Sequence, residues 1–127
     1  QAVSMNDILH QDVDVLAPCA LGAVLNDQSI PLLRAGIVAG AANNQLAEPR
    51  HGQALLDRGV LYAPDYAINA GGIINLYYEG DTRRWADVES HVRQIGPTLT
   101  QIFAKSEELK LPTSEIADQL AEEKFKR

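Results

Sequence analysis

The stretch between Ile37 and Leu76 constrains the fold of this chain more than any other part of the sequence. It contains two short apolar runs, IVAG and LYAP, which lead into the small residues and asparagines of AANNQ and INAGG. Short apolar runs bounded by Gly and Pro are typical of buried strands. Small residues let a ligand approach the backbone, and asparagine offers a donor and an acceptor without charge. Because ligands bind at the carboxyl ends of strands in open α/β sheets, this stretch predicts one wall of a binding cleft.

Composition excludes several classes of partner. The chain has 127 residues, enough for at most one domain with its own core, and its net charge is −6. This charge, without any Lys/Arg-rich block, argues against a nucleic-acid partner. No apolar run approaches the roughly 20 residues of a membrane span, and the first eleven residues do not resemble a secretory signal. The single cysteine, Cys19, favours a reducing compartment, so we predict a cytoplasmic protein.

Three strands are expected, at residues 13–17, 37–39 and 60–63, and the first and third are stopped by Pro18 and Pro64. A turn of helix around Ile30 to Leu33 is expected between the first two strands, capped by Asp27 or Ser29 and ended by Gly36. A helix at 50–58 ends at Gly59, and a buried helix starts near Asn69. Strands that alternate with helical links indicate a parallel sheet.

The last third, residues 84–127, is predicted to be helical. Apolar residues recur at spacings of three and four from Trp85 to Phe103, and Pro97 predicts a kink or break near Gly96. A final helix follows Leu111-Pro112, with Thr113 or Ser114 as its N-cap. Its inward face is predicted to contain Ile116, Leu120, Ala121 and Phe125.

The predicted fold class is therefore α/β, with about three parallel strands, flanking helices and a helical C-terminal third. Three strands make a thin sheet, and the strand at 13–17 has no apparent neighbour on its upstream side. An open apolar edge readily pairs with another strand. The chain as a whole, 1–127, is expected to be a single partial domain, the second half of a larger α/β domain.

Three segments of the sequence together resemble one known family. DVDVLAPCALGAVLND, IVAGAANNQLAEPRHG and LYAPDYAINAGGIIN resemble, in this order, the C-terminal dinucleotide-binding region of the leucine dehydrogenases. These enzymes belong to the glutamate/leucine/phenylalanine/valine dehydrogenase family. The resemblance implies a Rossmann-like fold and NAD-dependent oxidative deamination of a branched-chain L-amino acid to a 2-oxo acid, in which NAD accepts the hydride.

The same resemblance implies the site residues. Asn43 matches the family asparagine that orients the nicotinamide and its ribose, with Ala42 beside it. The turn whose backbone passes over the nicotinamide ribose is matched by residues Pro18, Cys19 and Ala20. On the substrate side, Asn44 matches an asparagine near the polar end of the amino acid. Gly71 and Gly72 leave room for the substrate, and Ile73 and Leu76 match the pocket for its side chain.

Two family features do not occur in this sequence. There is no Gly-rich pyrophosphate loop in a strand–turn–helix context, and no lysine precedes Lys105, so no residue matches the family's catalytic lysines. We therefore expect the cofactor-domain portion of a dehydrogenase that is inactive as this isolated chain. The alternative is a truncated, stand-alone oligomeric binding protein without catalysis, which pairs through the open sheet edge and the C-terminal helices. A weak nucleotide- or small-ligand-binding module is a third hypothesis.

Simpler interpretations exist for several of these residues. Asn43 and Asn44 could cap the loop after a strand, as asparagine often does. Cys19 is expected to be a small buried hydrophobe rather than a nucleophile. His51 is expected to form a hydrogen bond at a helix terminus, and no set of residues predicts a metal site. Asp65-Tyr66 is expected to form a turn after Pro64.

Overall fold

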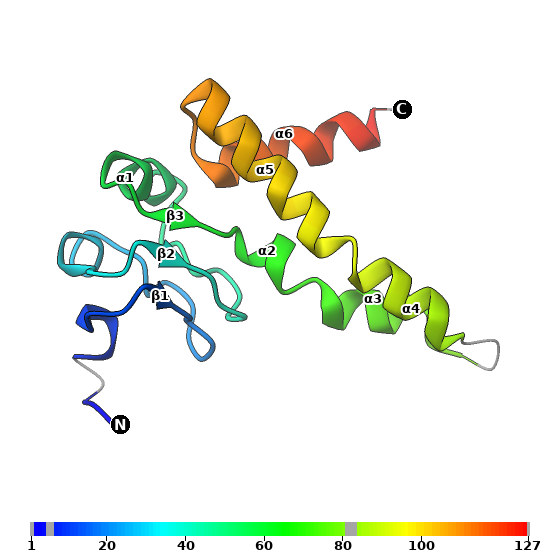
Figure 1. Cartoon of the computed structure of the whole chain (residues 1–127), viewed down its shortest axis with the longest axis horizontal. Coiled ribbons are helices and arrows are strands. Elements are labelled where there is room, and N and C mark those ends of the chain that lie inside the picture. Colours follow the sequence, from blue (N-terminus) through cyan, green and yellow to red (C-terminus); the bar gives the residue numbers. More distant parts are fainter. Residues whose placement is uncertain (1, 5–6, 81–83, 127) are drawn as a thin grey trace.

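The computed structural model describes residues 2–4, 7–80 and 84–126. Its centre is a parallel sheet with the strand order β1-β2-β3 (Figure 1). The strands are β1 (Val15–Leu16), β2 (Ile37–Val38) and β3 (Leu61–Tyr62). Val15 lies beside Ile37, which lies beside Leu61. The three predicted strands are confirmed, and each is shorter than its apolar run.

One face of the sheet forms the main core. The second residue of every strand points to this face, which is covered by the short 3₁₀ helix η2 (Ile30–Leu32) and by α1 (His51–Asp57). Leu55 of α1 is completely buried, and Gly59, with a φ of 68°, ends α1 as predicted. The buried apolar residues of this core are Leu16, Leu25, Ile30, Leu33, Ala35, Val38, Leu55, Val60 and Tyr62.

The opposite face of the sheet is open. The first residues of the strands, Val15, Ile37 and Leu61, are 48%, 37% and 38% exposed. Three apolar side chains side by side on an uncovered sheet are unusual, because contiguous exposed apolar surface usually marks a contact site. We call these three residues the open sheet face.

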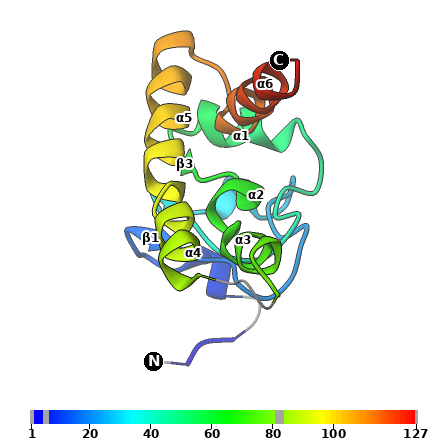
Figure 2. The same ribbon diagram turned by 90° about the vertical axis from the view of Figure 1, so that its right-hand side faces the viewer.

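The remaining helices form a second body of structure. They are α2 (Asp65–Ile68), α3 (Gly71–Tyr77), α4 (Trp85–Val92), α5 (Ile95–Leu109) and α6 (Thr113–Phe125), while the 3₁₀ helix η1 (Ile8–His10) precedes the sheet. α4 and α5 run nearly end to end (Figure 2). The predicted break is confirmed, and Pro97 lies in the first turn of α5, where a missing N–H costs little. A second core is built from Ile102, Ile116 and Ala117.

The helix expected to be buried after Asn69 is instead exposed. α3 projects away from the sheet (Figure 1), and its residues Ile73, Leu76 and Tyr77 are 67%, 58% and 77% exposed. The spacing of apolar residues correctly predicts a helix, but it does not show whether the surface that would cover them belongs to this chain. Only Ile74 of this helix is buried.

The predicted helix caps also need correction. At η2 the N-cap is Ser29, one of the two predicted residues, but its side chain makes no capping hydrogen bond. The side-chain oxygen of Asn26 instead accepts the N–H groups of Gln28 and Ser29. The turn ends at Leu33, before Gly36. At α6 the N-cap is Pro112. Phe125 was expected to face inward but is 89% exposed in the last turn. No helix among the described residues is long and apolar enough to cross a membrane.

Candidate functional site

The loops that follow β1 and β2 are joined by hydrogen bonds at the carboxyl ends of the strands. The Ala42 N–H donates to the Pro18 carbonyl oxygen at 2.9 Å, and the Ala23 N–H donates to the Asn44 carbonyl oxygen at 2.7 Å. The Ala41 N–H points at the Cys19 Sγ, 3.5 Å away. These bonds make one surface from residues 18–23 and 40–45, which we call the strand-end platform.

The backbone of the platform is closely packed against buried residues of the same two loops. A Cβ on Gly40 would collide with the backbone of Pro18, whose nitrogen would lie only 2.5 Å away. The buried side chain of Gln45 donates from its Nε2 to the carbonyl oxygens of Gly40 and Ala42, at 2.8 and 2.9 Å. Such packing fixes the backbone of the loop, so the side chains above it are presented from a rigid support.

Two platform residues have a left-handed backbone without being glycine. Ala23 has a φ of 55° and Asn44 a φ of 53°. Asparagine tolerates this conformation and alanine does so poorly, so both are held by their surroundings. Such conformations concentrate at ligand sites, where tertiary contacts stabilise them. Asn44 lies in the stretch that the sequence predicts as a cleft wall, and Ala23 lies in the neighbouring loop after β1.

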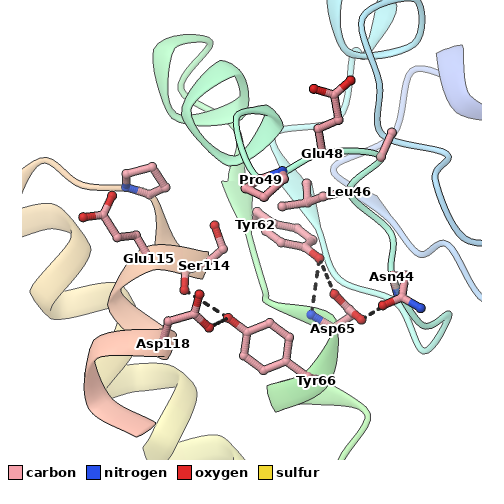
Figure 3. A pocket seen from close by; sticks show the side chains of 12 residues that line it. Asn44, Leu46, Glu48, Pro49, Tyr62, Asp65, Tyr66, Ser114, Glu115 and Asp118 are labelled. Carbon is pink, nitrogen blue, oxygen red and sulfur yellow. Dashed lines mark hydrogen bonds between the residues drawn. The ribbon is translucent and has the colours of Figure 1, made fainter. Parts of the chain in front are cut away.

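The start of α2 contacts the platform from the β3 side (Figure 3). Asp65 is 8% exposed, and its carboxylate accepts the Asn44 N–H at 2.7 Å and the Tyr62 hydroxyl at 2.8 Å. Just after α2, the Asn69 Nδ2 donates to the Asn43 Oδ1 at 2.6 Å. Polar side chains from three segments therefore meet at this edge of the sheet.

A separate cavity of about 390 Å³ lies between the platform, α2 and α6. Three of its carboxylates come from Glu48, Glu115 and Asp118, and the Tyr66 hydroxyl donates to Asp118 at 2.7 Å (Figure 3). This concentration of negative charge opposes a phosphate group. The cavity is therefore a poor site for a phosphate-bearing ligand.

Two tyrosines should make folding sensitive to alkaline pH. Burial raises the pKa of Tyr62 and of Tyr66 above the ordinary 10.0, and hydrogen bonds to Asp65 and Asp118 raise it further. Because the folded state keeps these protons, their contribution to stability is fully present below pH 10.0 and is lost as the pH rises above it. The unfolding free energy, measured by urea titration, should fall above that pH and fall less steeply in a Tyr62→Phe, Tyr66→Phe variant. Equal slopes would contradict this expectation.

Several predicted site residues lie on the platform. Asn43, Asn44 and Ala20 are exposed, whereas Pro18 and Ala42 are buried in the support beneath them. The expectation that Cys19 is buried is wrong: it is exposed, because it follows the end of β1 on the surface of the platform. The predicted substrate residues Gly71, Gly72, Ile73 and Leu76 lie on α3, which is linked to the platform through the Asn69–Asn43 hydrogen bond.

Sequence reasoning missed the residues that hold the platform. Gln45 and Asn69 were assigned no role, and Asp65, expected in a turn, is the first residue of α2. A signal was present in Asp65, because an acidic residue directly after a proline favours a helix start. Its partner Asn44 is 21 residues away in the sequence, and local patterns do not report such a contact.

A polar cluster at the start of α1 is structural. The His51 Nδ1 accepts the Glu48 N–H at 2.9 Å, which confirms the predicted hydrogen bond at a helix terminus. Hydrogen bonds from Arg50 and His51 lower the pKa of Asp27 to about 2, and the bond from Arg50 lowers that of Glu48. Among the described residues, no group of three or more His, Cys, Asp or Glu side chains is arranged to hold a metal ion.

Comparisons with known proteins identify the family of this chain. Residues 1–109 match the family model of glutamate/leucine/phenylalanine/valine dehydrogenase. The chain is 46% identical to leucine dehydrogenase from Geobacillus stearothermophilus, over 98% of this chain and 34% of that enzyme. It also resembles the crystal structure of L-tryptophan dehydrogenase from Nostoc punctiforme, with a TM-score of 0.91 and 46% identity over 95% of this chain and 36% of the other.

A more distant structure shares the fold alone. The hetero-hexameric glutamate dehydrogenase from Thermus thermophilus matches with a TM-score of 0.65 at 19% identity, over 91% of this chain and 29% of that chain. The chain spans about a third of the length of the curated relatives it matches. The three parallel strands, the flanking helices and the helical C-terminal part thus correspond to a Rossmann-like fragment of a dehydrogenase. The chain belongs to the glutamate/leucine/phenylalanine/valine dehydrogenase family.

Proposed function

We propose that this chain is the cofactor-domain portion of an NAD-dependent amino acid dehydrogenase, and that the nicotinamide end of the dinucleotide binds on the strand-end platform. The observation that carries the proposal is the exposure of Asn43 and Asn44 on a hydrogen-bonded support at the carboxyl ends of parallel strands. In open α/β sheets this is where nucleotides bind. NAD, when bound, supplies the hydride acceptor for the α-carbon of an amino acid.

The residues present fit the nicotinamide half of the cofactor. The carboxamide and ribose of that half need neutral donors and acceptors, which the Asn43 side chain and the backbone at Cys19 and Ala20 offer. Ala42 and Pro18 are buried and would support these residues through their own backbone hydrogen bond. The pyrophosphate needs a Gly-rich loop at a helix N-terminus, and this sequence has none. The platform therefore supports partial and weak binding.

The substrate side is proposed on α3 and Asn44. Ile73 and Leu76 are exposed on α3. Gly71 and Gly72, which precede them, have no side chains and would leave room for a substrate. An apolar pair on α3, together with the polar Asn44, would suit an L-amino acid with a branched aliphatic side chain. The relatives are named for leucine and for tryptophan, so the size of the side chains at positions 73 and 76 is the feature that would discriminate between them. One methylene group contributes roughly 1–3 kcal/mol to such discrimination.

Titration with NADH, followed by its fluorescence, tests the proposed cofactor site. We expect weak saturable binding, with a dissociation constant above the micromolar range. Asn43→Ala should weaken it by roughly twofold to tenfold, the usual effect of one lost hydrogen bond. Gln101→Ala, an exposed amide on α5, serves as the matched control and should change nothing. Tight binding that is indifferent to Asn43→Ala would place the site elsewhere.

A second candidate function is favoured by the open sheet face. Val15, Ile37 and Leu61 would bury apolar surface if a second copy of the chain covered them, and β1 offers a free edge for strand pairing. At about 25 cal/mol per Å² of apolar area, an interface of standard size would stabilise such a pair strongly. We propose a homodimer or larger oligomer, in which the C-terminal helices also contribute to the interface between the copies.

Sedimentation equilibrium tests the assembly. We expect a mass above that of the 13.8 kDa monomer at micromolar concentration. Val15→Lys on the open sheet face should dissociate it, because a buried lysine charge is costly. Leu32→Lys is the control, since Leu32 is 54% exposed on η2, away from this face. A folded wild-type monomer would exclude this function.

A further inference from the structure

The main chain of Asn44 is fixed at both of its polar groups. Its N–H donates to the Asp65 Oδ2 at 2.7 Å, and its carbonyl oxygen accepts the Ala23 N–H at 2.7 Å. Between these bonds the backbone has a φ of 53°. A side-chain-bearing residue in this conformation needs tertiary contacts to hold it. The two bonds supply them, and the Asn44 side chain stays exposed.

The carboxylate of Asp65 acts as a fixed support. Each of its oxygens accepts a different donor: Oδ1 accepts the Tyr62 hydroxyl at 2.8 Å, and Oδ2 accepts the Asn44 N–H (Figure 3). The Tyr62 hydroxyl in turn accepts the N–H of Asp65 itself at 3.3 Å. Asp65 and Tyr62 are 8% and 2% exposed. Hydrogen bonds from a backbone amide to a buried carboxylate are short and strong, so this contact can set a loop conformation.

The opposite end of α2 contacts the same turn. The Asn69 Nδ2 donates to the Asn43 Oδ1 at 2.6 Å and to the Ala41 carbonyl oxygen at 3.3 Å. The Asn69 N–H donates to the Asp65 carbonyl oxygen at 2.8 Å, which joins the two ends of α2. Residues 43 and 44 are therefore held by the two ends of one short helix. Of these two contacts, the one made by Asp65 is partly buried and involves a charged group, whereas the one made by Asn69 is exposed.

We propose that Asp65 is a positioning residue, which sets the Asn43–Asn44 turn in the conformation that receives the dinucleotide. This inference rests on the proposed function. Asp65 acts through the Asn44 backbone and does not itself touch the cofactor, because its oxygens are occupied by Asn44 and Tyr62. A conformation fixed before binding saves the ordering entropy that a mobile loop would lose.

Three variants separate positioning from general stabilisation. Asp65→Leu keeps a branched side chain, although a larger one, and removes the acceptor, and should weaken NADH binding by about tenfold or more. Asp65→Asn keeps an oxygen for the Asn44 N–H and should restore binding to within roughly threefold of wild type. Tyr62→Phe removes the other hydrogen bond of the same carboxylate and should leave the affinity within the same range. A merely structural role would lower affinity in parallel with the thermal unfolding midpoint in all three variants.

Amide exchange of Asn44, measured by NMR in the wild-type chain, gives a test that does not depend on any variant folding. We expect slow exchange, because this N–H is bound to a buried carboxylate. Rapid exchange in the native chain would overturn the proposal. Equal NADH affinity in wild type and Asp65→Leu would also overturn it, even while wild-type binding supports the proposed function.

The two proposals fail in different ways. If the wild-type chain does not bind NADH, the proposed function fails, and with it the role of Asp65 toward the cofactor. If wild type binds NADH and the affinities of Asp65→Leu and Tyr62→Phe fall equally with stability, only the positioning role fails. Slow exchange of the Asn44 amide together with a selective loss of affinity in Asp65→Leu supports both.

Discussion

Replacing Gly40 with alanine should destabilise the chain and disrupt the strand-end platform. The new Cβ would meet the backbone of Pro18, with its nitrogen 2.5 Å and its carbonyl carbon 2.7 Å away. Pro18 cannot withdraw without losing the hydrogen bond that its carbonyl oxygen accepts from Ala42. Overpacking against fixed backbone costs about 1–3 kcal/mol or more. Urea unfolding should show this loss, and NADH binding should fall with it.

Gly36→Ala is the matched control for this substitution. Gly36 precedes β2 as Gly40 follows it, and a Cβ there would meet nothing within 4 Å. The backbone of Gly36 does not need the left-handed conformation. Its replacement should therefore be neutral or stabilise by about 0.4–1 kcal/mol, through the lower entropy of the unfolded chain. If both variants unfold at the same urea concentration, the close packing of the two loops is wrong.

The second large effect concerns catalysis. The isolated chain should form no NADH from leucine and NAD above the rate of a blank without protein. The first lysine of the sequence, Lys105, lies on α5 at 4.0 Å from Glu123, and no Gly-rich pyrophosphate loop occurs in this sequence. A missing general base alone lowers rates by about 10²–10⁴.

Absorbance of NADH under substrate saturation measures this rate, with a complete leucine dehydrogenase assayed in parallel as the positive control. Leucine-dependent NADH formation that is abolished by Asn43→Ala or Asn44→Ala would show that the chain is catalytic by itself. The proposed function would then extend from a cofactor-domain portion to a full enzyme.

The sequence predicts the sheet and its loops well because their signals are local. Pro18, Pro64 and Gly59 end the strand or helix that precedes each of them. The short apolar runs next to them are too short for helices and therefore favour strands. The parallel order follows from alternation with helical links. The small residues after β2 were predicted to let a ligand approach the backbone, and one of them, Gly40, instead packs against the backbone of Pro18.

The features that were missed depend on contacts between distant residues. The Asp65–Asn44 and Tyr66–Asp118 hydrogen bonds join positions 21 and 52 residues apart, and no periodicity encodes such pairs. The exposure of Ile73 and Leu76 was missed for a related reason. Apolar spacing identifies a helix face, but the burial of that face depends on which surface covers it.

Mapping of backbone amide shifts during titration with NAD tests the central claim most directly. If the nicotinamide end binds on the strand-end platform, the amides of Cys19, Ala20, Asn43 and Asn44 should shift the most and should saturate together. Amides of α6, which lines the acidic cavity, should move little. Saturable shifts centred on α6, or none on the platform at saturating NAD, would contradict the account.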